Sequence, residues 1–349
     1  MPRNGAVWYD RAGHVLNAHG GCDLLHGGRY YLFGEHKVYG TTGNFAHVGV
    51  HAYSSDDLSE WTDGGLALAV GGKGGLPDGC VIERPKVIFC ATTGKFVMYF
   101  HWERDAHYNE AMVGIAQADS PAGPYVLMRT VRPTPSTYPI NARDEDRGAA
   151  ALVKSESEWK VPCNRSPEGE RALIYPAHVA QGQESRDMTL FVDRNKTAYL
   201  IHSSERNSTL HVVELSDDYV GFTGRWWRIA EKDWTEAPAV CEKDGWYYLI
   251  GSDCTGWAPN VARAYRARAI IGPWERLGNP CRGINPANGR GPELTWGGQS
   301  NFILETPDGR HLAMFDIWNP QNQLDSRLVW LPVRFESGEP VIEWQDRYK

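Results

Sequence analysis

The chain has 349 residues, of which 42% are hydrophobic and 23% charged, and its formal net charge is −7. This composition is typical of a folded globular protein, and a net acidic chain without basic runs argues against a nucleic-acid partner. No apolar stretch approaches the roughly 18 residues of a membrane-spanning helix, and no apolar segment of a signal peptide follows residues 1–5. We therefore expect a cytoplasmic protein without a membrane partner, although a shortened secreted form would look the same.

Short aromatic-rich segments recur five times along the chain. Each follows a turn residue such as Gly, Asp or Lys and continues into a run of apolar and aromatic residues, which is typical of a strand after a turn. The segments are 28–35, 94–100, 196–202, 244–251 and 308–315. Measured between Tyr30, Phe96, Ala198, Tyr247 and His311 they lie 66, 102, 49 and 64 residues apart, so one unit contains an insertion.

A second strand pattern follows the first four aromatic-rich segments. The copies are 52–58, 114–120, 212–219 and 263–268, and 327–333 is the candidate for a fifth copy. Five units of several short strands, with few segments of helical period, predict an all-β five-bladed β-propeller formed by a single domain over residues 1–349. Two unrelated domains or a β-sandwich are the alternatives, but a sandwich does not explain why the second pattern trails the first each time.

The insertion lies at about 132–184. It holds Pro133, Pro135 and Pro139 and the charged run 143–147, a composition typical of a loop. A long loop in a compact fold is often a lid or a specificity element. The alternative is a solvated excursion without function.

A polar residue lies 11 to 13 positions before the reference residue of each aromatic-rich segment (Tyr30, Phe96, Ala198, Tyr247 and His311). Propeller blades run outward from the axis, so the strand before each aromatic-rich segment should be innermost and should begin at the central channel. The residues at this offset are His19, Glu83, Asp187, Glu236 and Gln299. The sequence therefore predicts that three carboxylates and one amide converge on one pocket.

This set of side chains suits the cleavage of a glycosidic bond. The reaction needs a protonated acid for the leaving oxygen and a group that activates water, and carboxylates crowded together raise the pKa of the acid. A Pro two residues after Glu83 and after Glu236 fixes the backbone just past each acid. Glu35 and the sugar-stacking indole of Trp257 are further candidates, with a surface ion pair and core packing as the respective alternatives.

Signatures of other chemistry are missing from the sequence. It contains no G-x-S-x-G elbow, no H-E-x-x-H motif and no P-loop. The seven cysteines lack C-x-x-C spacing, so we expect buried free thiols and no zinc site. No cofactor is expected to be required. His19 is expected to hydrogen-bond within the fold, or else to hold a water or a structural Ca²⁺ on the axis.

Together these motifs resemble glycoside hydrolase family 43, and within it the branch of exo-β-1,3-galactanases and related galactosidases. The resemblance covers nearly the whole chain apart from the insertion, and it implies a five-bladed propeller that hydrolyses with inversion. The stretches that carry it are 17–21, 31–37, 83–87, 185–191, 236–238, 254–257, 299–300, 325–327 and 329–332.

The resemblance also implies roles for the pocket residues. Glu236 matches the general acid, Asp187 the carboxylate that tunes and orients it, and Glu83 a further pocket glutamate. Most members carry an Asp base in the first blade, where this chain has His19 with Asn and Ala before it. In the galactanase branch a Gln in its imidic-acid form is thought to act instead, and Gln299 matches it, with Glu83 as the competing base.

The implied activity is the release of terminal galactose from β-1,3-galactan or arabinogalactan-type glycans, so the expected partner is an oligosaccharide or polysaccharide. A β-galactofuranosidase or an α-L-arabinofuranosidase of the same family is the close alternative. Because the usual Asp base is absent, a non-catalytic carbohydrate-binding propeller is the alternative from another class. The expected substrate contacts are Glu35, His19, Asn207, Thr255 and Trp257.

Overall fold

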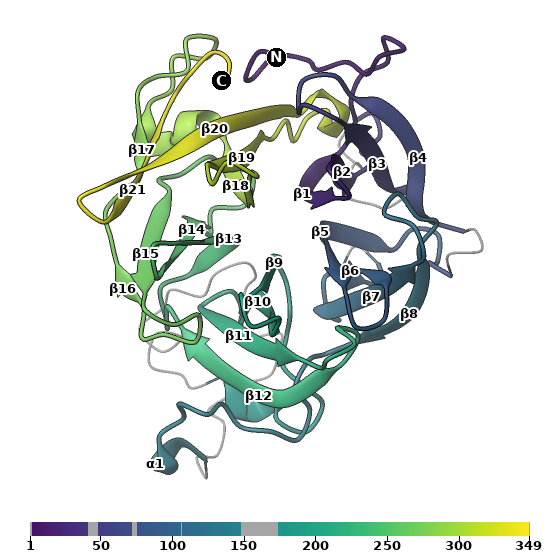
Figure 1. The fold of residues 1–349 in the computed structure, drawn as a ribbon. Helices are drawn as coiled ribbons and strands as arrows, with labels where there is room; N and C mark the ends of the chain where they lie inside the picture. The colour runs from purple at the N-terminus through teal and green to yellow at the C-terminus, as the bar shows by residue number, and fades with distance from the viewer. Residues whose placement is uncertain (1, 41–47, 72–74, 106, 148–173, 349) are drawn as a thin grey trace.

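The computed structural model describes residues 2–40, 48–71, 75–105, 107–147 and 174–348. Over these residues the strands form five sheets that surround a central axis as the blades of a propeller (Figure 1). Four sheets contain four strands and the last contains five. The predicted all-β five-bladed propeller is therefore confirmed.

The first two blades are simple antiparallel meanders. Blade 1 consists of β1 (His19–His26), β2 (Arg29–Glu35), β3 (Gly49–Ser55) and β4 (Thr62–Ala69). Blade 2 consists of β5 (Val81–Cys90), β6 (Lys95–Glu103), β7 (Met112–Ala118) and β8 (Val126–Val131).

The next two blades repeat this order. Blade 3 consists of β9 (Met188–Val192), β10 (Ala198–Ser204), β11 (Thr209–Leu215) and β12 (Phe222–Ile229). Blade 4 consists of β13 (Thr235–Lys243), β14 (Trp246–Asp253), β15 (Arg263–Ala267) and β16 (Glu275–Arg276).

Blade 5 differs because an extra strand joins its outer edge. It consists of β18 (Gln299–Glu305), β19 (His311–Ile317), β20 (Arg327–Glu336), β21 (Glu339–Glu343) and the parallel β17 (Cys281–Arg282). The two chain termini lie side by side against this blade (Figure 1), where the amide of Asn4 donates to the carbonyl oxygen of Asp346 at 2.8 Å. The N-terminal segment thus closes the ring.

The strand positions within each blade follow the sequence prediction. The aromatic-rich segments form the second strands and the trailing pattern forms the third strands. The first strands contact one another in a ring around the axis, in the order β1, β5, β9, β13, β18 and back to β1. The residues that open these first strands are therefore brought together at the axis.

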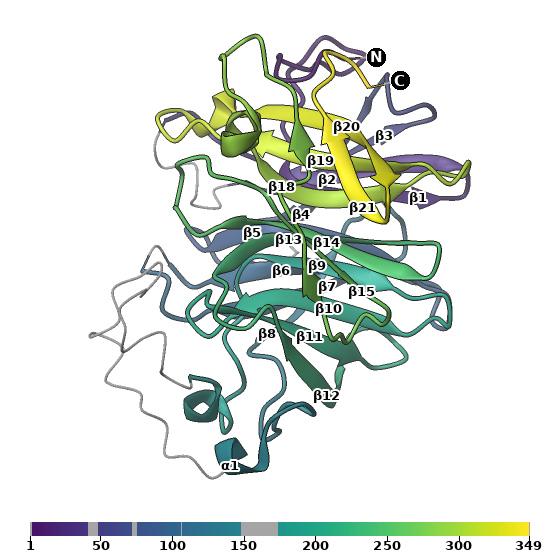
Figure 2. The ribbon, with the colours of Figure 1, turned by 90° about the vertical axis from the view of Figure 1, so that its left-hand side faces the viewer.

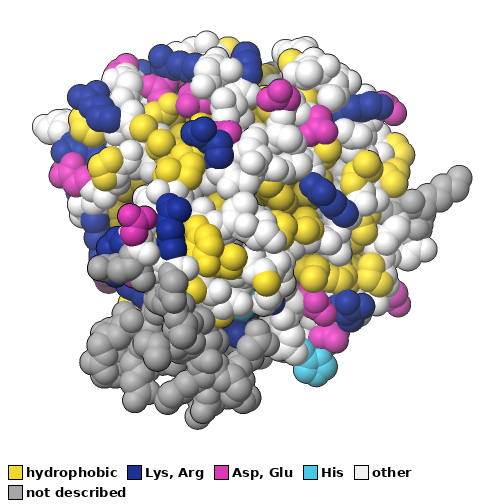
Figure 3. Space-filling model, turned by 90° about the horizontal axis from the view of Figure 1, so that it is seen from below, with side chains coloured by type: hydrophobic (Ala, Val, Ile, Leu, Met, Phe, Trp, Pro, Cys, Tyr) yellow, Lys and Arg dark blue, Asp and Glu magenta, His cyan; other side chains and the backbone are white. Residues whose placement is uncertain are grey.

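Apolar side chains fill the spaces between neighbouring blades. Among the described residues there are five such clusters, one for each pair of adjacent blades. The described cysteines are buried free thiols, as expected, and Cys163 lies outside the described residues. The outer surface around β12 mixes apolar and charged side chains (Figure 3). No helix in the described part of the chain is long or apolar enough to cross a membrane.

The predicted insertion connects blade 2 to blade 3. Its described parts are 132–147, which contains the short helix α1 (Asp144–Arg147), and 174–184, which contains the 3-10 turn η2 (Tyr175–His178). Two more 3-10 turns, η3 (Pro292–Gly297) and η4 (Gln323–Asp325), flank strands of blade 5. Figures 1 and 2 both show α1 at the bottom edge of the molecule, on the side where β12 lies. Residues 148–173 of the insertion lie outside the described residues.

Candidate active site

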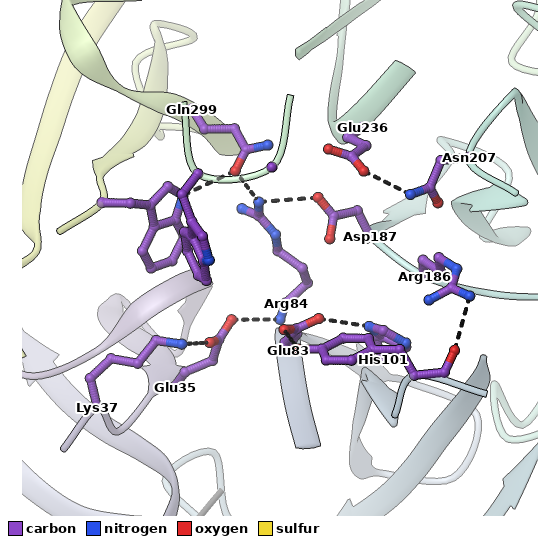
Figure 4. Close-up of a pocket in the computed structure, with 14 residues that line it drawn as sticks. Glu35, Lys37, Glu83, Arg84, His101, Arg186, Asp187, Asn207, Glu236 and Gln299 are labelled. Atoms are coloured by element: carbon purple, nitrogen blue, oxygen red, sulfur yellow. Dashed lines mark hydrogen bonds and ion pairs between the residues drawn. The ribbon is translucent and has the colours of Figure 1, made fainter. Parts of the chain in front are cut away.

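A pocket opens at the axis, where the innermost strands begin. Its cavity measures about 310 Å³, within the size range of small-molecule sites. Four of the five residues found at the constant sequence offset line it, namely Glu83, Asp187, Glu236 and Gln299 (Figure 4). The other side chains or backbone atoms that line it belong to Glu35, Lys37, Arg84, His101, Tyr108, Arg186, Asn207, Gly256, Trp257 and Trp318.

The structure does not bring two of the predicted residues to the pocket. His19 is buried, and its Nδ1 lies 2.7 Å from a carboxylate oxygen of Asp316. Glu35, which pairs with His19 in the register of β1 and β2, lines the pocket in its place. Thr255 is turned into its own loop, where its hydroxyl donates to the carbonyl oxygen of Ala258. The structure therefore supports neither His19 nor Thr255 as a substrate contact.

A β-bulge follows the pocket residue in both acid-bearing strands. The register of β5 shifts between Glu83 and Lys86, and that of β13 shifts between Glu236 and Ala239. In each strand the residue just after the acid has a positive φ, 56° at Arg84 and 52° at Ala237. A bulge bends the strand and re-aims a side chain. The Glu-x-Pro motif seen in the sequence therefore marks the local kink that turns each carboxyl group toward the axis.

Glu236 has the properties of a proton donor. Burial and the nearby negative charge of Asp187 raise the pKa of the Glu236 carboxyl to about 8. Asn207 donates a hydrogen bond from Nδ2 to Glu236 Oε1 at 2.7 Å. Because Oε1 accepts this bond, the carboxylic proton belongs on Oε2. Glu236 is thus mainly a neutral acid at pH 7, with its proton on the oxygen that Asn207 does not bond.

Glu83 has the opposite properties. Its Oε1 accepts a hydrogen bond from Tyr108 at 2.6 Å and its Oε2 lies 2.8 Å from His101 Nδ1. Burial alone would raise the pKa of Glu83, but the hydrogen bonds and positive charge of His101 lower it to about 2. His101 also bonds Glu103 at 2.9 Å, and its pKa is raised to about 9 by the two carboxylates against the effect of burial. Glu83 is thus an ionised acceptor.

Arg84 ties three blades together at the floor of the pocket (Figure 4). Its guanidinium donates to Gln299 Oε1 and lies 3.1 Å from Asp187 Oδ2. Trp318 Nε1 also donates to Gln299 Oε1, at 3.0 Å. Both groups can only donate, so the Gln299 oxygen is held as an acceptor and its amide nitrogen faces Ser252 Oγ, at 2.9 Å.

Several pocket residues were not singled out by the sequence. They come from the ends of strands or from loops whose position only the fold defines. Arg84, Lys37 and Arg186 stand beside predicted pocket residues in the motifs that carry the resemblance, and this adjacency was the available signal. His101 and Tyr108 had no comparable pattern, nor did Trp318, whose ring packs edge-on against Trp257 with centroids 5.7 Å apart.

The described residues contain no group of three or more His, Cys, Asp or Glu side chains placed to hold a metal ion. The pocket instead contains paired carboxyl groups with opposite protonation states. Such a pair can protonate a leaving oxygen and deprotonate a water molecule, which is the chemistry of glycoside hydrolysis.

Comparisons with known proteins agree with this chemistry. The sequence model of glycosyl hydrolases family 43 matches residues 161–338. The chain is similar to the solved family 43 β-1,3-galactosidase BT3683 with galactodeoxynojirimycin, at 43% identity and a TM-score of 0.90 over 99% of both chains. It is also similar to a Phanerochaete chrysosporium exo-β-1,3-galactanase variant with β-1,3-galactotriose, at 28% identity and a TM-score of 0.77 over 99% of this chain and 67% of that chain.

An exo-β-1,3-galactanase from Clostridium thermocellum is similar at 30% identity, with a TM-score of 0.76 over 98% of this chain and 64% of that chain. A comparison with curated proteins found no match.

Proposed function

Because this chain belongs to glycosyl hydrolase family 43, we propose that it is an inverting, exo-acting glycoside hydrolase that releases terminal galactose from β-1,3-galactan or arabinogalactan-type glycans. The observation that carries the proposal is the pairing, in one pocket, of a neutral Glu236 with an ionised Glu83. The similar proteins named above as β-1,3-galactosidases and exo-β-1,3-galactanases support galactose as the sugar.

In the proposed reaction Glu236 donates its Oε2 proton to the glycosidic oxygen as the bond from that oxygen to the anomeric carbon breaks. Asp187 keeps Glu236 protonated through its negative charge. A water molecule attacks the anomeric carbon from the opposite face of the ring and loses a proton to a base. The anomeric configuration is inverted, so a β-galactoside yields α-galactose.

The hydrogen bonds favour Glu83 over Gln299 as the group that accepts this proton. Arg84 and Trp318 occupy the acceptor positions of Gln299 Oε1, which leaves no room for the proton that an imidic-acid form would place there. The amide nitrogen of Gln299 can orient the water by donating to it. Glu83 is already ionised at neutral pH, so it can take the proton directly.

One further pocket residue is proposed to bind the sugar, and another is assigned to the acid. Asn207 Oδ1 is buried and Asn207 Nδ2 donates to Glu236, so we assign Asn207 to holding the acid rather than to contacting the sugar. Trp257 is 40% exposed at the pocket, where an indole can stack on a sugar ring. Glu35 is held by Lys37 and by the amide of Arg84, so we assign it to the pocket wall.

Hydrolysis by two carboxyl groups and water requires no cofactor. The axial Ca²⁺ or water named in the sequence analysis stays a prediction. The ammonium of Lys86 lies 2.9 Å from the carbonyl oxygen of Gly20 and 3.3 Å from that of Arg84. Carbonyl oxygens are typical ligands of Ca²⁺, and here a protein cation already contacts them. We therefore expect exhaustive treatment with EDTA to leave turnover unchanged, and loss of turnover that added Ca²⁺ restores would contradict this.

The experiment that tests the function is the incubation of purified protein with β-1,3-galactan and with arabinogalactan, followed by identification of the released monosaccharide. We expect galactose, which proton NMR detects first as the α-anomer, and no release by Glu236→Gln. Release of arabinose, or of galactose only from galactofuranosides, would favour the alternative activities of the family. Sugar binding without release would favour a non-catalytic propeller.

A further inference from the structure

The turn that carries Asn207 is strained and strongly anchored. It joins β10 to β11, and the first three of its four residues, Glu205, Arg206 and Asn207, have positive φ values of 50°, 60° and 64°. Consecutive left-handed residues are unfavourable for side chains other than Gly, and such strain persists only where the surroundings enforce it. The third residue of this turn, Asn207, donates from Nδ2 to Glu236 Oε1 at 2.7 Å.

A buried charge cluster holds Glu205, the first residue of the turn, in its left-handed conformation. The Glu205 carboxylate, 1% exposed, accepts from Arg228 Nε at 2.6 Å and from Arg228 Nη2 at 3.0 Å. It also lies 3.0 Å from His211 Nε2. Burial alone would raise the pKa of Glu205, but Arg228 and His211 lower it to about 2. The carboxylate is therefore ionised and tied to two neighbouring strands.

The insertion holds both sides of this cluster. From its first part, Asn141 exchanges two hydrogen bonds with the backbone of Arg228, at 2.8 and 3.0 Å, and from its second part the ring of Tyr175 lies 4.9 Å beneath the Arg228 guanidinium. At its end, the buried Glu184 accepts from the backbone amide of Arg206 at 2.9 Å and pairs with the Arg206 guanidinium at 3.1 Å. The insertion thus contacts the turn directly and through Arg228.

We propose that the described ends of the insertion, 132–147 and 174–184, act as a buttress that presses the Glu205–Asn207 turn, and through it Asn207, against the general acid Glu236. Asn207 is a positioning residue: by donating to Glu236 Oε1 it directs the acidic proton to Oε2. Glu184, Glu205 and Arg228 affect catalysis only by holding the turn that carries Asn207. This inference rests on the proposed function, since it concerns the same acid. It assigns the insertion a role in the chemical step rather than in covering the pocket.

The test compares two β-galactosides that differ in how much they need the acid. β-1,3-Galactobiose has a poor leaving group that must be protonated, whereas a 2,4-dinitrophenyl galactoside does not. We expect Asn207→Ala to lower kcat about 10-fold or more on galactobiose, part of the roughly 10²–10⁴-fold that acid–base catalysis contributes, and to change it little on the aryl substrate. Glu184→Gln and Glu205→Gln should give the same pattern with smaller losses.

A double variant shows whether the buttress acts through Asn207. Adding Glu205→Gln or Glu184→Gln to Asn207→Ala should cause little further loss on galactobiose, because the contact they support is already gone. The matched control is Glu231→Gln, because Glu231 also pairs with Arg228, at 2.6 Å, but is half exposed and does not touch the turn; it should retain wild-type kcat on both substrates.

The outcomes separate this inference from the proposed function. If wild-type protein hydrolyses neither substrate, the proposed function fails and this inference with it. If the wild type is active but each variant loses equally on both substrates, or the double variants are additive, only the buttress is wrong. Where Glu205→Gln fails to fold, judged by its melting curve, Glu184→Gln and Asn207→Ala decide the question alone.

Discussion

At the scale of single residues, the site is an arrangement of donors and acceptors around two carboxyl groups. Glu236 lies beside another carboxylate and is kept neutral, whereas Glu83 lies beside a protonated His101 and is kept ionised. The same side-chain type therefore has two roles, because its neighbours differ in charge.

The pKa of Glu236 predicts the alkaline limb of the pH profile. The acid must be protonated to act, and its pKa is raised to about 8, so kcat/KM on galactobiose should be level well below this pH, halve at it and fall about tenfold per unit well above it. Asp187→Asn removes the negative charge that helps to raise this pKa, so the limb should move to lower pH. An alkaline limb that does not move in Asp187→Asn would contradict the assignment.

The choice between Glu83 and Gln299 can be settled by chemical rescue. Both Glu83→Gln and Gln299→Ala should lose most activity, the first with weaker substrate binding as well. Azide is a nucleophile that needs no base, so it should restore glycosyl transfer in the variant that has lost the base. We expect rescue, seen as glycosyl azide by mass spectrometry, in Glu83→Gln. Rescue of Gln299→Ala alone would return the role to Gln299.

At the scale of single elements, the β-bulge that follows the Glu in each Glu-x-Pro motif sets the direction in which that side chain points. Glu236 and Pro238 flank Ala237, whose left-handed φ of 52° kinks β13. The amide of Ala237 also donates to Asp187 Oδ2 at 3.1 Å. One residue therefore positions both the acid and the carboxylate that tunes it.

The backbone conformation of Ala237 can be tested by substitution. Ala237→Val places a β-branched residue in the left-handed region, which costs about 1–3 kcal/mol, so we expect lower stability and a loss of kcat as Glu236 is displaced. Ala237→Gly removes this strain and should keep both stability and activity. Equal behaviour of the two variants, measured by urea unfolding and galactobiose turnover, would show that the positive φ is not required.

At the scale of the whole molecule, the pocket exists because five blades close into a ring. The N-terminal segment completes that closure against blade 5, where Asn4 Nδ2 donates to the carbonyl oxygens of Trp330 and Gln345 at 2.8 and 2.9 Å. The amide of Trp330 donates back to Asn4 Oδ1 at 2.8 Å. These bonds lie between the two ends of the chain, outside the pocket lining.

The closure predicts a variant that loses stability but not catalysis. Asn4→Ala removes a hydrogen-bond partner from buried backbone groups of Trp330 and from the partly buried carbonyl of Gln345, which should lower the free energy of unfolding by about 1–3 kcal/mol. The kcat of the folded variant should equal that of the wild type, because Asn4 does not line the pocket. A drop in kcat at a temperature where the variant is fully folded would show that closure reaches the active site.

The sequence by itself determined the fold class and the offset that brings Glu83, Asp187, Glu236 and Gln299 to one pocket. Strand patterns involve residues close together in the sequence, so the sequence alone reveals them. The first strands of all five blades surround the axis, so residues that begin these strands must lie close together. The same offset did not bring His19 to the pocket lining, because blade 1 presents Glu35 from its second strand, and His19 instead hydrogen-bonds Asp316 within the fold. Thr255 was expected from the family motif, but its hydroxyl is used within its own loop.

Only the tertiary structure decided the protonation states and the contacts of the pocket. Those depend on burial and on groups far apart in sequence, such as Arg84 beneath Gln299 and Asn207 against Glu236. The position of the insertion against Arg228 is of the same kind, since its composition indicates only a loop. Electrostatic effects act over a few ångströms of space without regard to sequence separation, and for that reason the contacts that set the protonation states could be read only from the folded chain.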